Sequence, residues 1–369
     1  MSARSEREVC AAILAALPRV TPVRLRALLL AAGTPELAVA AIADGRVGVE
    51  AIPGEVVAGW RHALDTTAVA VREHLAHRPT RVLVFDDPDW PLSLDAPSMP
   101  AVLLAEGDDY SALHRPRIAV VGTRHPTPQG IADAREVATV LADSGATVVS
   151  GLAYGIDAAA HDASLVAGGT TIGVTATGLD QPYPKPNAPL WSRVRAQGLI
   201  LGENPFGTRP EPRLFPIRNR IIAALSSSVV IVEAAVRGGA LHTALAAKDM
   251  GKHLWAIPGS RRNPVAEGCN RLIADGAQPL LDPIDIAVAV GRDPVSLAAD
   301  PTPVRGRQRR TAPLSTAAAE VHRACGGEPA TLDQLVGVTG LPVAAVVAAT
   351  RELARLGRMQ RASGRLWPL

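Results

Sequence analysis

Two arginines at the expected start of a helix are the most unusual charged residues of this sequence. Arg218 and Arg220 lie in the segment FPIRNRII, in which Pro216 suits the first helical position. A helix N-terminus already carries partial positive charge, so cations there cost from a few tenths to about 1 kcal/mol. Arg218 also falls on the apolar side of this helix. Two interpretations are open: its stem packs while its head reaches water, or a bound polyanion completes the site.

Further cations and aromatic rings lie in or beside the loops that follow the expected strands. Aromatic residues make up only 3% of the chain, yet four of its six Phe and Tyr residues lie there. These are Tyr154, Tyr183, Phe206 and Phe215, and the cations beside them are Arg124, Lys185, Arg209, Arg213, Arg218 and Arg220. Single-stranded nucleic acid needs this combination, because cations neutralise phosphates and rings stack on bases at ~1–3 kcal/mol each. The alternative is that some of the rings close the top of the core.

Acid–base chemistry has only weak candidates in this sequence. Asp157 and His161 stand at i and i+4 of GIDAAAH, but the favoured interpretation is that Asp157 orients the helix start while His161 packs beneath it. Glu233 ends the run VVIVEA without a base or metal partner in view, so we expect it to accept N–H groups of the following glycine loop. Walker A, GxGxxG, HExxH and GxSxG motifs are absent. We therefore expect no enzyme, no metal and no cofactor.

The elements that position these residues alternate regularly from Arg117 onward. Apolar strands are expected at 117–122, 147–151, 171–178, 199–203, 229–234 and 253–259. Helices are expected to begin near Gln129, Ile156, Asn187, Pro216, Ala240 and Glu267. This alternation predicts an α/β fold with an extended Rossmann-like, doubly wound parallel sheet. Ligands of such sheets bind at the carboxyl ends of the strands, where helix N-termini and backbone N–H groups favour anions.

The domain organisation follows from shifts in composition. Residues 1–77 read as a small helical domain, and 78–290 as the Rossmann-like domain with extended N-terminal strands. Residues 291–314 read as a basic Pro/Gly linker, and 315–369 as three helices and a hairpin turning at Ser363-Gly364, which is typical of a winged helix. The first hairpin lacks the glycines that would present N–H groups to phosphate, so DNA binding is not assigned to 1–77. The third helix of the last domain contains mainly Ala and Val before Arg351. Its pattern is therefore compatible both with binding to DNA and with binding to another protein.

Composition and cysteine usage indicate the cellular compartment in which the protein is expected. The 369 residues carry a net charge of only +3, which identifies no partner. Cys10, Cys269 and Cys325 are odd in number and form no CxxC, which favours a reducing compartment over a disulfide framework or zinc site. The N-terminus has no signal-peptide pattern, and no apolar run reaches the length of a membrane span. We expect a cytoplasmic protein without membrane association.

Six motifs resemble those of one known family. GTR, VVSGLAYGIDAAAH, TATGLDQPYP, LFPIRNRIIAALS, VVIVEA and AIPG follow the order and spacing of the DNA-processing protein A family (DprA, also called Smf), over about residues 82–282. The resemblance implies a Rossmann-like core that binds single-stranded DNA without cleaving it and forms a homodimer. It also implies an interaction with the RecA recombinase, which the family helps to load onto incoming DNA in natural transformation or recombination.

The resemblance also implies which residues shape the DNA site near the first two strands. Gly122, Thr123 and Arg124 would form the first phosphate-binding turn. Gly151 and Gly155 would shape the second loop.

The remaining implied site residues come from later loops. Lys185 of YPKPN and Arg218, Asn219 and Arg220 of RNR would line the pocket, and Phe206 is a further candidate for base stacking. These cations are expected at one edge of the sheet. We therefore favour the interpretation that Arg218 and Arg220 bind a polyanion over the interpretation that the head of Arg218 only reaches water.

The sequence therefore predicts a non-enzymatic single-stranded DNA-binding protein that acts as a recombination mediator. It also predicts that replacing Arg124 or Arg218 by Ala lowers DNA affinity and leaves the fold intact. One alternative is a nucleotide-processing enzyme on a Rossmann-like fold, for which Glu233 is placed suitably but the usual PGGxGTxxE run is missing. Another is a sequence-specific regulator that acts through the winged helix.

Overall fold

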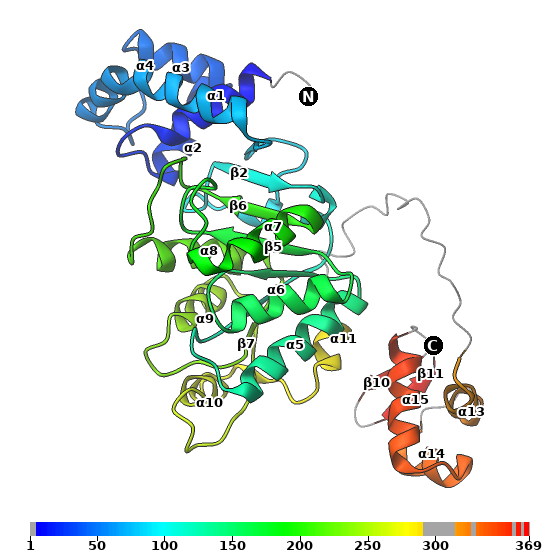
Figure 1. Ribbon diagram of the computed structural model, residues 1–369. Helices are drawn as coiled ribbons and strands as arrows, with labels where there is room; N and C mark the ends of the chain where they lie inside the picture. The colour runs from blue at the N-terminus through cyan, green and yellow to red at the C-terminus, as the bar shows by residue number, and fades with distance from the viewer. Residues whose placement is uncertain (1–4, 291–313, 326–329, 356–358, 363–364, 369) are drawn as a thin grey trace. The chain divides into compact units, whose positions relative to one another are not determined.

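Short apolar runs from Arg81 onward form one nine-stranded sheet in the computed structural model (Figure 1). The structure describes residues 5–290, 314–325, 330–355, 359–362 and 365–368. The strand order is β1-β2-β6-β5-β4-β3-β7-β8-β9. All pairs from β6 to β9 are parallel, whereas β2 is antiparallel to both β1 and β6. The strands span Arg81–Val84 (β1), Val102–Gly107 (β2), Arg117–Val121 (β3), Thr147–Ser150 (β4), Thr171–Thr175 (β5), Leu199–Gly202 (β6), Ser228–Ile231 (β7), His253–Ala256 (β8) and Gln278–Pro279 (β9).

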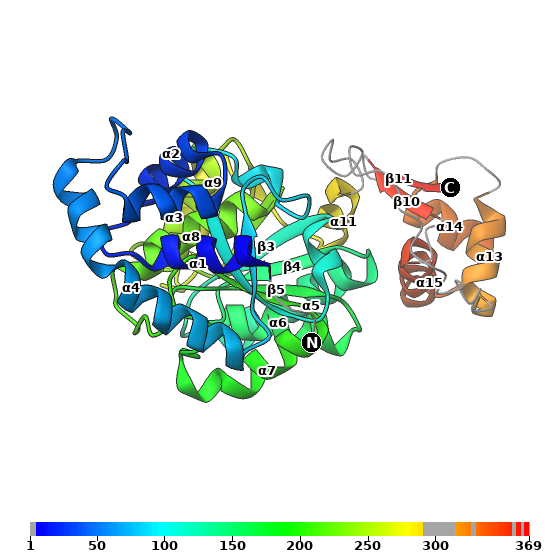
Figure 2. The ribbon, with the colours of Figure 1, turned by 90° about the horizontal axis from the view of Figure 1, so that it is seen from above.

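Helices cover both faces of this sheet, as its doubly apolar strands require. Figure 2 shows α5, α6 and α7 on one face and α8 and α9 on the other. The helices span Pro128–Asp143 (α5), Ile156–Val166 (α6), Ala188–Gln197 (α7), Leu214–Leu225 (α8), Ala240–Asp249 (α9), Glu267–Ala274 (α10) and Ile284–Val290 (α11). Short 3-10 helices lie at Leu92–Leu94 (η1), Tyr110–Leu113 (η2) and Lys185–Asn187 (η3). The predicted α/β fold class is confirmed, and six of these helices begin within two residues of their expected starts.

One of those starts changes the interpretation of the RNR motif. Helix α8 begins at Leu214, two residues before the expected position. Arg218 and Arg220 therefore lie in its second turn. The unfavourable effect of the helix dipole is concentrated in the first turn, so it is weaker for these arginines than the sequence suggested.

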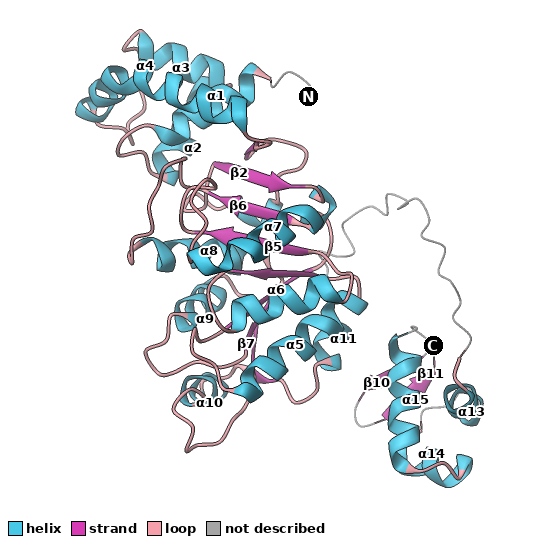
Figure 3. Ribbon diagram, viewed as in Figure 1, coloured by secondary structure: helices cyan, strands magenta, loops and turns pink. Residues whose placement is uncertain are grey.

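Four helices precede the sheet (Figure 3) and share a core with its edge. They span Glu6–Ala16 (α1), Pro22–Ala32 (α2), Pro35–Ala43 (α3) and Gly54–His77 (α4). Side chains of Ser5, Thr21 and Thr34 cap the first three. Buried residues of these helices form one hydrophobic cluster with Val82, Leu104 and residues of α7. The residues Met1–Leu297 accordingly group into one compact unit.

The second unit is Ala298–Leu369. Its helices span Thr316–Ala324 (α13), Leu332–Thr339 (α14) and Val343–Arg355 (α15), and they bury Val321, Leu335, Val346 and Leu353 against one another. Strands Met359–Ala362 (β10) and Arg365–Pro368 (β11) pair antiparallel. Three helices and a hairpin occur in the expected order, while the assignment as a winged helix stays a prediction. The turn at Ser363-Gly364 and nearly all of the expected linker lie outside the described residues.

Among the residues that the structure describes, no single helix is both long and apolar enough to cross a membrane. Two sharply bent helix pairs, α2–α3 and α14–α15, reach that length and composition only when taken together.

Candidate nucleic-acid interface

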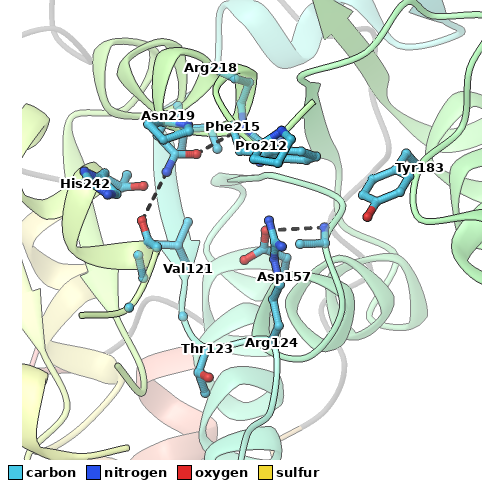
Figure 4. A pocket seen from close by; sticks show the side chains of 18 of the residues that line it. Val121, Thr123, Arg124, Asp157, Tyr183, Pro212, Phe215, Arg218, Asn219 and His242 are labelled. Atoms are coloured by element: carbon cyan, nitrogen blue, oxygen red, sulfur yellow. Dashed lines mark hydrogen bonds between the residues drawn. The ribbon is translucent and has the colours of Figure 1, made fainter. Parts of the chain in front are cut away.

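A cavity of about 500 Å³ opens beside the carboxyl ends of β3 and β7, where the strand order changes direction. This is the position at which open α/β sheets bind their ligands. The loop after β3, the start of α8 and the start of α9 form most of the lining. Figure 4 shows Asn219 and His242 on one side of this cavity and Tyr183 on the other.

The β3–α5 loop is held in place by close contacts with two neighbouring elements. A Cβ added at Gly122 would lie 2.5 Å from Cγ1 of Ile156, so only glycine fits there. The backbone N–H of Thr123 donates to the carbonyl oxygen of Glu233 at 2.7 Å. The N–H of His125 donates to Oγ1 of Thr123 at 3.2 Å. Arg124 is exposed on a loop whose backbone is therefore fixed.

Arg124 and two aromatic rings form a wall of the cavity. The guanidinium carbon of Arg124 lies 5.0 Å from the ring centroid of Phe215, within cation–π distance. The rings of Phe215 and Tyr183 are 5.6 Å apart and tilted by 51°. Tyr183 is 38% exposed, so part of its surface remains open to a ligand. This wall supplies one cation and two rings within a few ångströms of each other.

Arg218 has a different environment from the one the sequence suggested. It contributes to the cavity lining, yet it is only 4% exposed, so its head does not reach water. Its Nη1 donates to the carbonyl oxygens of Gly151, at 2.7 Å, and Val174. Burial lowers its pKa to about 10, a shift that Asp157 opposes, so it stays charged at neutral pH. Because it links the ends of β4 and β5, the expectation that Arg218→Ala leaves the fold intact is corrected: its removal would leave two buried carbonyls without a donor.

Asp157 and His161 are packing residues, which confirms the favoured interpretation. Oδ2 of Asp157 accepts the N–H groups of Gly151 at 3.1 Å and Ala153 at 3.4 Å, so it orients the loop before α6. Burial raises the pKa of Asp157, and Arg218 limits the rise. His161 is fully buried, and burial lowers its pKa to about 3. Its Nδ1 lies 2.6 Å from Oγ1 of Thr171 of β5, and the lowered pKa keeps the ring neutral at pH 7.

Glu233 also has a structural role, but with a different partner from the one expected. Its carboxylate accepts the backbone N–H of Thr127 at 2.9 Å and the Thr127 hydroxyl at 2.6 Å. Thr127 is the N-cap of α5, and its hydroxyl accepts the N–H of Gly130 at 3.0 Å. A Cβ added at Gly130 would lie 2.3 Å from Oε2 of Glu233. The partner is thus the loop after β3, and not the glycine loop after β7 that the sequence suggested.

The structure brings most of the predicted site residues together. Gly155 has a φ of +77°, and a Cβ there would lie 2.4 Å from the carbonyl oxygen of Thr123, so the two glycine loops touch. Asn219 accepts from Nε of Arg218 at 3.1 Å and donates to the carbonyl oxygen of Gly239 at 3.2 Å, which links α8 to the start of α9. The predicted residues in or directly beside the cavity are Gly122, Thr123, Arg124, Gly151, Gly155, Arg218 and Asn219.

Three other predicted residues lie outside the cavity lining. Lys185 is exposed in η3. Arg220 forms an ion pair with Glu203, in which both side chains are largely buried. Burial raises the pKa of Glu203, and Arg220 opposes that rise. Phe206 stacks on His74 of α4 at a centroid distance of 5.0 Å. Phe206 therefore faces the N-terminal helices, a contact that was not predicted from the sequence.

Two histidines of the cavity lining were not predicted from the sequence. His125 follows Arg124 in the first loop, and His242 lies in the first turn of α9. The available signal was position, because each histidine lies three residues after a glycine of a strand-end loop, Gly122 and Gly239 respectively.

The fold places this protein among the open α/β proteins whose ligands bind outside the carboxyl ends of parallel strands. The family model described as DNA recombination-mediator protein A matches residues 81–291. The chain is 36% identical over 339 residues to Protein Smf of Synechocystis sp., covering 84% of this chain and 85% of the relative. The chain belongs to this DNA recombination-mediator protein A family, also called DprA or Smf.

Further relatives agree with this assignment. A putative DNA processing protein DprA of Mycobacterium tuberculosis is 35% identical, over 78% of this chain and 77% of the relative. The X-ray structure of DNA processing protein A from Streptococcus pneumoniae has a TM-score of 0.66 and 31% identity, covering 77% of this chain and 98% of that chain. A structure described as showing the single-stranded DNA binding mode of DNA processing protein A from Helicobacter pylori has a TM-score of 0.54 and 30% identity, covering 59% and 98%.

Proposed function

We propose that this protein binds single-stranded DNA in the cavity beside β3 and β7 and acts there without cleaving it. The observation that carries the proposal is the wall formed by Arg124, Phe215 and Tyr183, which offers a cation for phosphate and ring faces for bases. The Helicobacter pylori relative, described by its single-stranded DNA binding mode, supports the same ligand.

The engagement of the acidic groups supports a role without a catalytic step. Glu233 is bound by Thr127, and Asp157 by two backbone N–H groups. A general base needs a carboxylate that can reach the substrate, and both carboxylate oxygens of Glu233 are already bound by Thr127. The nucleotide-processing alternative thereby loses Glu233, the carboxylate on which it rested.

A fluorescence anisotropy titration with a labelled oligo-dT tests the proposal. Arg124→Ala removes the exposed cation of the wall, so we expect affinity to fall about tenfold or more. Arg135→Ala is the matched control, because Arg135 is an exposed arginine of α5 outside the cavity lining. Equal affinity for Arg124→Ala and the control would reject the proposed site.

We also propose that the bound strand is protected and passed to the RecA recombinase in natural transformation or recombination, in the cytoplasm, by a homodimer. Membership of the recombination-mediator family supports this step. The test is the rate at which RecA hydrolyses ATP on single strands precoated with a single-strand-binding protein. We expect this protein to raise that rate, and Arg124→Ala to remove the increase. Sedimentation equilibrium tests the homodimer.

A further inference from the structure

Two loops form the side of the cavity that faces away from α9. The β5–α7 loop, residues 176–187, contributes Tyr183 to the lining. The β6–α8 loop, residues 203–213, contributes Pro210 and Pro212. Neither loop contains a regular strand or a long helix, so their positions depend on what they pack against.

These loops are tied to each other by backbone and side-chain hydrogen bonds. The N–H of Gly178 donates to the carbonyl oxygen of Thr208 at 3.0 Å. Oδ1 of Asp180 accepts the N–H of Gly207 at 2.9 Å. A shift of one loop therefore displaces the other.

Helix α4 contacts both loops through its last two turns. His74 stacks on Phe206 with an interplanar angle of 14°, and its Nδ1 bonds the carbonyl oxygen of Ala70 at 3.0 Å, which fixes the imidazole ring. Nε2 of His74 also lies 4.0 Å from Oδ2 of Asp180. Just beyond the helix, Nη2 of Arg78 donates to the carbonyl oxygen of Leu179 at 3.1 Å.

Arg78 is itself held firmly. Its Nε lies 2.8 Å from Oε1 of the buried Glu106 of β2, and Nε of Arg195 of α7 lies 2.9 Å from the other oxygen of that carboxylate, within ion-pair distance. The end of α4 is thus anchored to the sheet where it touches the loops. Pro210 follows Phe206 by four positions, so a displacement of the Phe206 ring reaches the cavity rim within about 14 Å of chain.

From this geometry we propose that α4 positions the cavity wall, and that His74 and Phe206 are positioning residues for single-stranded DNA. The inference rests on the proposed DNA site and extends it, because it gives the N-terminal helices a part in DNA binding without contact with DNA. The Phe206 ring does not stack on bases; it transmits the position of α4 to Pro210, Pro212 and Tyr183.

Variants of the full-length protein test this proposal. His74→Ala and Phe206→Ala are each expected to lower oligo-dT affinity about two- to tenfold, the range of an aromatic pair. The double variant is expected to lose no more than either single one, because both remove the same contact. The slope of log affinity against log salt stays at the wild-type value, since no phosphate contact is lost. His74→Phe restores affinity, and Val69→Ala, an exposed change on the same helix, leaves it unchanged.

Hydrogen exchange in the absence of DNA separates this proposal from the proposed function. Peptides covering 203–213 are expected to exchange faster in His74→Ala than in the wild type. Unchanged exchange there overturns the positioning role, whatever the DNA affinity. If peptides 203–213 exchange faster in His74→Ala while Arg124→Ala binds oligo-dT as tightly as the wild type, the proposed DNA site is overturned. In that case α4 still positions the loops of the cavity wall. Wild-type affinity of His74→Ala beside weakened Phe206→Ala overturns the proposal in favour of direct stacking by Phe206.

Discussion

At the scale of single residues, burial decides what the arginines of this site do. Arg124 is exposed and faces Phe215, so its charge is available to a phosphate. Arg218 is buried and donates to two backbone carbonyls, so its charge holds strand ends together. Arg220 is paired with Glu203. The three arginines therefore have different environments, and of the three only Arg124 has the exposure that the proposed contact with DNA requires.

Arg218→Ala is expected to destabilise the protein by about 2–5 kcal/mol. The change leaves the carbonyls of Gly151 and Val174 without donors and removes the positive charge that faces buried Asp157. Urea unfolding followed by tryptophan fluorescence measures the loss. A free energy of unfolding within about 0.5 kcal/mol of the wild type, the range typical of surface changes, would contradict the structural role.

His161 is expected to make stability depend on pH in acid. Its folded pKa of about 3 lies below the ordinary value of 6.5, so between these values the unfolded state binds more protons. Stability is then fully present above pH 6.5 and falls as pH decreases, by at most about 1.4 kcal/mol per pH unit. We expect His161→Asn to lower stability at pH 7 and to show a shallower decline between pH 6 and 4. Parallel declines in the two proteins would show that His161 does not cause the dependence.

At the scale of elements, strand-end glycines allow the loops to approach one another. Gly122, Gly151 and Gly155 each stand where an added Cβ would overlap a neighbour at 2.4–2.5 Å. The loops after β3 and β4 consequently form one surface, and Glu233 fixes its far end through the cap of α5.

Gly155→Ala is expected to disturb that surface more than the fold. With a φ of +77° and a ψ of −123°, Gly155 has a backbone conformation outside the left-handed helical region that is strongly disfavoured for alanine, whose Cβ would also press on the Thr123 carbonyl. The Arg124 turn must then move, so oligo-dT affinity should fall while the circular dichroism spectrum keeps its shape. Gly145→Ala is the control, since Gly145 has a similar φ of +76° but no neighbour within 4 Å of its added Cβ. Equal affinities of the two variants would mean that contact between the loops does not position Arg124.

Most elements, but only part of the site, could be predicted from the sequence. The strands were predicted because continuous apolar runs such as VVIVEA end in glycine loops, and the grouping of Gly122, Arg124 and Asn219 follows from strand ends meeting at one edge. The burial of Arg218 depends on carbonyls 67 and 44 residues away along the chain. The partner of Phe206 lies on a helix near the N-terminus. Such tertiary contacts leave no periodic signal in the sequence.

At the scale of the whole molecule, the N-terminal helices and the sheet share one hydrophobic core. The cluster joins Trp60 and Leu75 of the helices to Val82 and Leu104 of the sheet edge and Trp191 of α7. Residues Ala298–Leu369 group separately around their own small core.

Truncations are expected to have unequal effects. A chain of residues 1–290 keeps the shared core, so we expect it to melt cooperatively and to retain oligo-dT binding. A chain of residues 78–369 exposes the apolar faces of β1, β2 and α7, and we expect it to aggregate or to melt at a much lower temperature. Calorimetry of both chains is the measurement. Loss of all DNA binding from 1–290 would instead favour a regulator that acts through the C-terminal unit.

The most direct test of the central claim is oligo-dT affinity across a salt series for the full-length wild type and Arg124→Ala, with a duplex of equal length as competitor. We predict tighter binding of the single strand than of the duplex, an affinity that falls linearly with log salt, and a slope smaller by about 0.7 in Arg124→Ala, as expected for one lost phosphate contact. Equal affinity for both DNA forms, or an Arg124→Ala slope identical to that of the wild type, would contradict the account.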